Sequence, residues 1–141
     1  MQIKIKKLDS RAKVPTFAHE GDAGMDLYCI DSVTIKPGEL VKIGTGISVE
    51  LPLGYVALVW DKSGIAVNRQ LKVFGGVLDA GYRGEYFVNL FNAGSEAQIF
   101  EAGDKVGQVL IQKIEHPKII EVDEFSDTAR GDGGFGSTGK N

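Results

Sequence analysis

The chain has 141 residues, of which 43% are hydrophobic, so it is long enough for one compact domain with a real core and too short for a second. Its formal net charge of -3 gives no electrostatic reason to bind a nucleic-acid polymer or an anionic membrane. The one cysteine, Cys29, cannot form an intrachain disulfide, so the fold needs no oxidising compartment. We expect its side chain in the core.

The amino-terminal segment, residues 1–7, alternates apolar and basic residues and predicts a first strand. It contains no apolar run long enough for a signal peptide or a membrane span, which favours a cytoplasmic protein. Turns rich in Pro and Gly then separate short segments that predict strands at 40–43, 55–60, 87–91, 105–111 and 119–122. One short helix is expected at 63–70, with Ser63 as its cap. This punctuation is typical of an all-β sandwich or barrel.

The stretch from Gly75 to Glu85 has the most unusual composition. Apolar residues lead into Asp79, small residues follow, and Tyr82 and Arg83 precede the apolar run at 87–91. The pattern predicts a β-hairpin with a functional tip. The alternative is an ordinary Gly-rich turn in which Asp79 caps its own backbone.

Other stretches carry groups that suit phosphate. Lys62, Ser63 and a glycine stand at the start of the predicted helix, where free NH groups attract anions, although a simple cap is the alternative. Asp26 lies in an otherwise apolar strand and is equally consistent with a solvent-facing polar residue. The Gly-rich end, residues 130–141, combines Arg130 for phosphates with Phe135 for stacking on a base. A disordered terminus is the alternative there.

Taken together, residues 23–28, 62–64, 76–84, 103–108 and 130–139 resemble, in order, the five motifs of the trimeric deoxyuridine triphosphatase (dUTPase) family. Three departures are local. Lys62 stands where the family usually has Arg, which replaces a two-pronged phosphate contact by a point charge. Val106-Gly107 replaces a common Ile-Ala pair, and Asp61 replaces a common Pro.

The resemblance implies an all-β, jelly-roll-like (β-clip) subunit at 1–129 and a flexible arm at 130–141 that closes over the nucleotide. It implies a homotrimer with active sites shared between chains. As the net charge already indicates, we expect no nucleic-acid polymer and no membrane as a partner. The implied reaction is hydrolysis of dUTP to dUMP and pyrophosphate with Mg2+, which keeps uracil out of DNA and supplies dUMP for dTMP synthesis.

Carried over by position, the resemblance makes Asp79 the general base for a water that attacks the α-phosphorus. Tyr82 would lie under the deoxyribose and leave no room for a 2′-hydroxyl. Asp26 and Gln108 would reach magnesium only through water, or Asp26 would brace the sugar pocket. The implied substrate-binding residues are Lys62, Ser63, Gly64, Gly76, Val77, Leu78, Tyr82, Gln108, Arg130, Phe135, Gly136, Ser137 and Thr138.

Two rival functions remain open at this stage. A dCTP deaminase of the same fold would need a glutamate base ten residues beyond Asp79, where this chain has Asn89, which cannot accept a proton from water. A nucleotide-sensing interaction protein would keep the pocket without catalysis. His19 and His116 are assigned no role.

Overall fold

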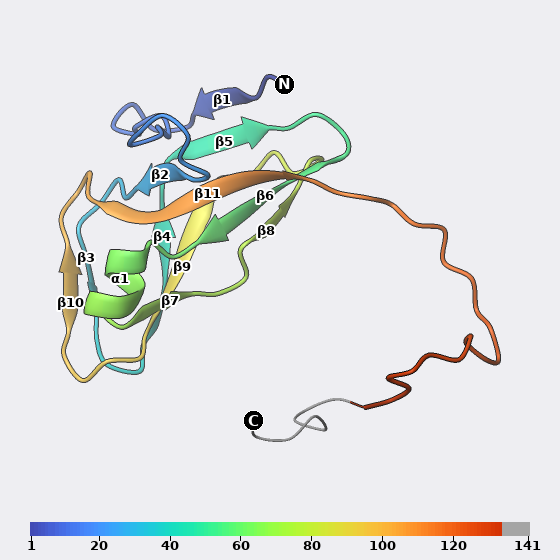
Figure 1. Cartoon of the computed structure of the whole chain (residues 1–141). Helices are drawn as coiled ribbons and strands as arrows, with labels where there is room; N and C mark the ends of the chain where they lie inside the picture. The colour runs from blue at the N-terminus through green and yellow to red at the C-terminus, as the bar shows by residue number, and fades with distance from the viewer. Residues whose placement is uncertain (134–141) are drawn as a thin grey trace.

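The computed structural model describes residues 1–133, and in this range strands and one short helix form the whole regular structure (Figure 1). The strands are β1 (Lys4–Lys7), β2 (Met25–Tyr28), β3 (Val33–Ile35), β4 (Leu40–Gly44), β5 (Ile47–Glu50), β6 (Tyr55–Trp60), β7 (Leu71–Val73), β8 (Val77–Asp79), β9 (Phe87–Asn92), β10 (Gln98–Phe100) and β11 (Lys105–Lys113), with α1 (Ser63–Asn68) between β6 and β7. The expectation of an all-β fold with one short helix is confirmed.

Four antiparallel sheets share one core. The larger two have the strand orders β2-β11-β6-β8 and β4-β9-β7, and the pairs β1-β5 and β10-β3 complete the layers. Alternation along β9 places Val88 and Leu90 fully inside, because successive strand residues point to opposite faces. Cys29 is also buried, as expected, and its thiol donates a hydrogen bond to the Glu101 carbonyl at 3.1 Å.

Most predicted elements match the structure. Strands at 40–43, 55–60, 87–91 and 105–111 correspond to β4, β6, β9 and β11, and the predicted helix corresponds to α1. No helix in the described part of the chain is long and apolar enough to cross a bilayer.

Two local expectations are wrong. Lys62 occupies the position before α1 and Ser63 is its first residue, so no side chain caps this helix among the described residues. Residues 119–122 form no strand, and their apolar side chains Ile119, Ile120 and Val122 are exposed. Beyond β11 the chain leaves the body of the domain (Figure 1), so these residues lie beside no strand in the described part of this chain.

The expected hairpin at 75–85 is also wrong. β8 pairs with β6, whereas β9 pairs with β4 and β7, so the two strands lie in different sheets. The reason is a close approach at Gly76, whose carbonyl accepts a hydrogen bond from Val59 N at 2.7 Å. A Cβ at Gly76 would lie 2.2 Å from the Val59 carbonyl oxygen, so only glycine lets β8 join β6 here. Residues 80–86 therefore connect two sheets.

Candidate active site

Asp79 lies at a polar cavity of about 360 Å³, which we call the Asp79 cavity. Val77, Leu78 and Tyr82 were also expected at the site and line the same cavity. Its remaining lining residues are Lys42, Gly75, Glu85, Phe87 and Asn89. Asp79 ends β8 opposite Val56 of β6, and its carbonyl accepts the Tyr82 amide at 3.0 Å, which closes a turn. Its carboxylate is exposed and makes no hydrogen bond or ion pair with residues 1–133, so it can bind water.

β8 is the edge strand of its sheet, and this position leaves backbone groups available to a ligand. Backbone groups in a strand alternate in direction, and the Gly76 carbonyl points to β6. The NH and C=O of Val77 therefore point away from β6. A planar ring with its own donors and acceptors could pair with this edge.

Tyr82 folds back over its own turn. Its hydroxyl donates to the Glu85 carbonyl at 3.1 Å, and its ring stacks on Tyr86 with centroids 6.3 Å apart. A Cβ at Gly84 would lie 2.3 Å from the Tyr82 hydroxyl, so glycine is needed for this pose. Tyr82 remains 39% exposed as a residue, and it lines the cavity.

A second cavity, of about 240 Å³, gathers the residues expected to hold phosphate. We call it the Lys62 cavity. Its lining residues are Lys62, Ser63, Gly64, Ile65, Lys105 and Gln108. The Gln108 amide donates to the Asp61 carbonyl at 3.1 Å, which directs this side chain along the cavity wall. The sequence thus placed four residues here and did not assign Lys105.

Asp26 lies beneath this cavity rather than on the solvent face. It is 1% exposed and forms ion pairs with Lys62 and with Lys105, the latter at 2.6 Å. Burial by itself raises the pKa of Asp26, but hydrogen bonds from Lys105 and Lys62 outweigh it and hold the pKa below the ordinary value. Asp26 therefore stays ionised, and the three side chains together carry one net positive charge.

The two cavities lie at opposite ends of β6. Asp79 pairs with Val56, whereas Gln108 pairs with Trp60, four residues further along the strand. At about 3.3 Å per residue this separation is about 13 Å along the strand. One chain therefore does not bring its own Asp79 next to its own Lys62 cavity.

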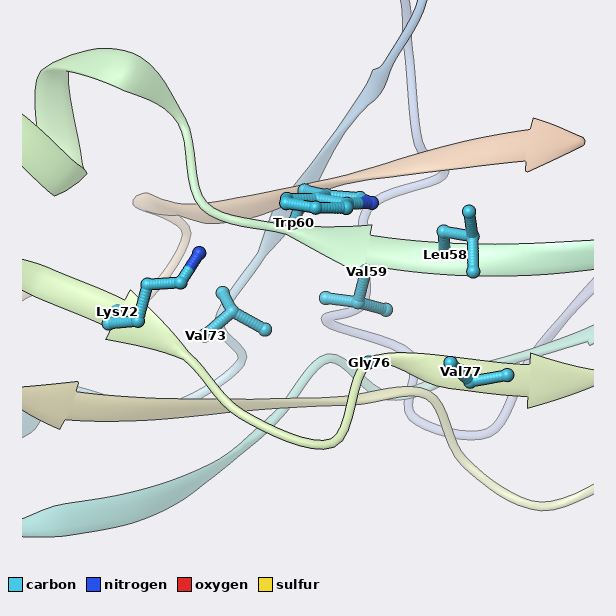
Figure 2. Close-up of a pocket in the computed structure, with 7 residues that line it drawn as sticks. All are labelled: Leu58, Val59, Trp60, Lys72, Val73, Gly76 and Val77. Atoms are coloured by element: carbon cyan, nitrogen blue, oxygen red, sulfur yellow. The ribbon is translucent and has the colours of Figure 1, made fainter. Parts of the chain in front are cut away.

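A third cavity, of about 290 Å³, is mainly apolar and lies beside β6, β7 and β8 (Figure 2). Trp60 and Lys72 border it, with the Lys72 ammonium 5.1 Å from a ring centroid of Trp60. Val77 lines both this cavity and the Asp79 cavity. It holds no carboxylate, so we assign no chemistry to it.

The expected arm is only partly described. Arg130 is exposed, and its Nε donates to the Gly133 carbonyl at 2.8 Å. Arg130 lines neither the Asp79 cavity nor the Lys62 cavity, and the chain beyond β11 runs away from the body (Figure 1). Phe135, Gly136, Ser137 and Thr138 lie outside the described residues.

The comparisons with known proteins agree with one another. The dUTPase family model matches residues 10–139. A deoxyuridine 5′-triphosphate nucleotidohydrolase of Alkaliphilus metalliredigens is 48% identical over 139 residues, which are 97% of this chain and 96% of the relative. The enzyme of the same name from Clostridioides difficile is 47% identical, with 97% of each chain covered.

Solved structures give the same result. The Staphylococcus bacteriophage 80alpha dUTPase with dUPNHPP superposes with a TM-score of 0.93 at 29% identity, covering 99% of both chains. A mutant dUTPase from phage phi11 of S. aureus, described with a structural Mg(II) ion, has a TM-score of 0.84 at 26% identity and covers 90% of this chain and 100% of its own. The jelly-roll-like fold is therefore confirmed.

Proposed function

This chain belongs to the dUTPase family and hydrolyses dUTP, and we propose that a water bound by Asp79 attacks the α-phosphorus to give dUMP and pyrophosphate. The observation that carries the mechanism is the exposed carboxylate of Asp79 at the end of β8, beside Tyr82; this carboxylate has no hydrogen-bond or ion-pair partner among residues 1–133. Such a carboxylate can orient a water and accept its proton. Phosphoryl chemistry otherwise requires alignment, charge neutralisation and exclusion of bulk water.

The base is read by the free edge of β8. Uracil presents an NH between two carbonyl groups, which suits a strand edge that offers both NH and C=O at Val77. Cytosine would present its donor and acceptor reversed and leave buried groups unpaired, a mismatch that can reject an analogue by about 10^4-fold. The Tyr82 ring lies under the deoxyribose and excludes a 2′-hydroxyl.

The phosphates of dUTP occupy the Lys62 cavity. Two lysines that share one buried aspartate leave one positive charge there, and Ser63 and Gln108 add neutral hydrogen bonds. The sequence suggested that Asp26 either reaches magnesium through water or braces the sugar pocket. Its burial favours a bracing role, but one that fixes Lys62 and Lys105 rather than the sugar pocket. The arm at 130–141 then closes the site, with Arg130 on the terminal phosphate and Phe135 on the base.

A Mg2+ ion would be held by the triphosphate of the substrate and by water rather than by protein side chains. Residues 1–133 contain no group of three His, Cys, Asp or Glu side chains that could hold a metal ion. Mg2+ is readily bound by phosphate oxygens and water alone, so a dUTP–Mg2+ complex fits this site without direct protein ligands. When bound, the ion neutralises charge on the triphosphate.

The active site is shared between chains of a homotrimer. Water bound to Asp79 must reach the α-phosphorus, so the phosphate-holding residues must lie within a few ångströms of that water. A separation of about 13 Å along β6 is too large for one chain to provide both parts. A neighbouring chain in a closed ring supplies the Lys62 cavity, and the arm comes from a chain other than the one that provides Asp79.

One assay separates this function from its rivals. Purified protein should release pyrophosphate from dUTP with Mg2+, and release from dCTP, dTTP and UTP should be far slower. A dCTP deaminase would instead release ammonia and leave the triphosphate intact. A sensor would bind dUTP without turnover. Asn89 lines the Asp79 cavity, and its amide donates to the Phe74 carbonyl at 3.2 Å. Because a deaminase would need a glutamate base at this position, the amide favours hydrolysis over deamination.

A mixing experiment tests the shared site. Two inactive chains are co-expressed in equal amounts: Asp79→Asn with its arm intact, and a chain that ends at residue 129 with Asp79 intact. Random assortment around a closed ring gives about a quarter of the sites an intact Asp79 and an intact arm, so activity should reappear. If trimers contain both chains and activity stays at the parental level, each arm serves its own Asp79 and the shared site is refuted.

A further inference from the structure

The turn after β4 and the first two residues of β5 together form a corner, residues 45–48, which is tied to the segment that carries Tyr82. Ser48 Oγ donates to the Arg83 carbonyl at 2.8 Å, and Thr45 Oγ1 donates to the Tyr86 carbonyl. Two further bonds come from the corner backbone: Gly46 N donates to Glu85 Oε1 at 2.7 Å, and the Ile47 carbonyl accepts the Tyr86 amide at 2.8 Å. Four hydrogen bonds therefore hold residues 83–86.

The two hydroxyls of the corner are buried for this purpose. Thr45 is 1% exposed and Ser48 is 6% exposed, and each makes its one side-chain hydrogen bond within the described residues to this segment. A buried hydroxyl without a hydrogen-bond partner is destabilising. The hydrogen bonds to the Arg83 and Tyr86 carbonyls therefore stabilise both the corner and the segment that it contacts.

The corner is itself fixed in place. Gly46 adopts a φ of +68°, which disfavours other residues, and a Cβ there would lie 2.9 Å from Ala12 Cβ and from Ile30 Cγ2. The Gly46 carbonyl also accepts the Leu8 amide at 2.7 Å. The corner can thus act as a rigid support.

The segment that the corner holds determines the pose of Tyr82. The Tyr82 hydroxyl donates to the Glu85 carbonyl and its ring stacks on Tyr86, and both of these residues are bonded to the corner. We propose that Thr45 and Ser48 are positioning residues that hold Tyr82 in the pose that discriminates deoxyribonucleotides from ribonucleotides. This inference rests on the proposed placement of Tyr82 under the sugar.

The test compares dUTP with UTP in variants of the corner. Thr45→Val keeps the side-chain shape and removes the donor, and Ser48→Ala removes the other donor. Each should lower the ratio of kcat/KM for dUTP to that for UTP by about five-fold, the factor given by loss of one ordinary hydrogen bond. Thr45→Ser, which keeps the donor, should retain most of the ratio. Ser32→Ala is the control, because Ser32 makes its hydrogen bond to Glu101 instead.

The ratio is a suitable measurement because both substrates meet the same folded fraction of enzyme, so partial unfolding of a variant cancels. Tyr82→Ala is measured alongside to test the premise. If Tyr82→Ala leaves the ratio unchanged, Tyr82 does not read the sugar and that part of the proposed function is wrong. If Tyr82→Ala lowers the ratio while Thr45→Val and Ser48→Ala match Ser32→Ala, the corner is only structural and the present inference is overturned.

Discussion

Removal of the Tyr86 hydroxyl should stabilise the protein, and increasingly so at high pH. Tyr86 is fully buried, and its hydroxyl has no hydrogen-bond partner among the described residues. A hydroxyl buried without a partner costs about 1–3 kcal/mol in protein mutational data. Tyr86→Phe keeps the ring that stacks on Tyr82 and should therefore raise the unfolding free energy at pH 7 by about 1 kcal/mol.

The pH dependence of unfolding provides a second test. Burial is the main cause that raises the pKa of Tyr86 from 10.0 to about 12. Because the pKa is higher in the folded state than in the unfolded state, the unfolded state releases this proton first. The unfolding free energy of the wild type is therefore unaffected by this ionisation below pH 10 and falls as pH rises toward 12. The rise in pKa from 10.0 to about 12 corresponds to about 2.7 kcal/mol, so the advantage of Tyr86→Phe over wild type should grow by up to that amount across this window.

Urea unfolding of both proteins at one fixed protein concentration, at pH 7 and at several values from pH 9 to 11.5, measures this difference. The fixed concentration removes the effect of subunit association on apparent stability. Tyr55→Phe, at a partly exposed tyrosine of β6, is the matched control for loss of a phenol. A wild-type minus Tyr86→Phe difference that stays constant from pH 7 to 11.5 would refute the conclusion that this hydroxyl is desolvated.

Three further changes have defined outcomes. Asp79→Asn should keep dUTP binding, measured by calorimetry, and lower turnover by roughly 10^2–10^4, the range for losing a general base; near-normal turnover would remove Asp79 from the mechanism. Gly76→Ala should lower the unfolding free energy, measured by thermal unfolding, by about 1–3 kcal/mol, because the new Cβ overlaps the Val59 carbonyl. Gly81→Ala is the control, because a Cβ at Gly81 meets no atom within 4 Å. Asp26→Asn should make the unfolding free energy less dependent on pH in acid. The pKa of Asp26 is below 3.8 in the folded state, so ionised Asp26 stabilises the fold above pH 3.8, and this stabilisation is lost as pH falls further.

The sequence predicted which segments form strands better than it predicted which strands pair with one another. Residues 55–60 and 105–111 are short apolar runs between turn signals, and both became strands, because this information is local. The partner of β8 is not local information. It depends on one close contact between Gly76 and the Val59 carbonyl, which no pattern within 75–85 contains.

The same distinction applies to the site. Lys62, Ser63 and Gln108 come together at one cavity, as the order of the motifs suggested, and Asp79 and Tyr82 meet at another. The one available signal for Lys105 was its place inside the 103–108 motif, and its pairing with Asp26 needs the β2–β11 register. Thr45 and Ser48 had no sequence signal, because their role depends on contacts between distant segments.

Cys29 has a consequence for experiment. It is the one sulfhydryl in the sequence, and burial raises the pKa of this thiol, so very little thiolate is present at neutral pH. Its backbone is bonded to the turn before Lys105, with Cys29 N donating to the Asp104 carbonyl at 3.0 Å. A thiol reagent can therefore react only when this end of β2 and β11 opens. The alkylation rate under native conditions reports how often the support beneath the Lys62 cavity opens, without any introduced label, and a bound nucleotide that tightens this cavity should slow it.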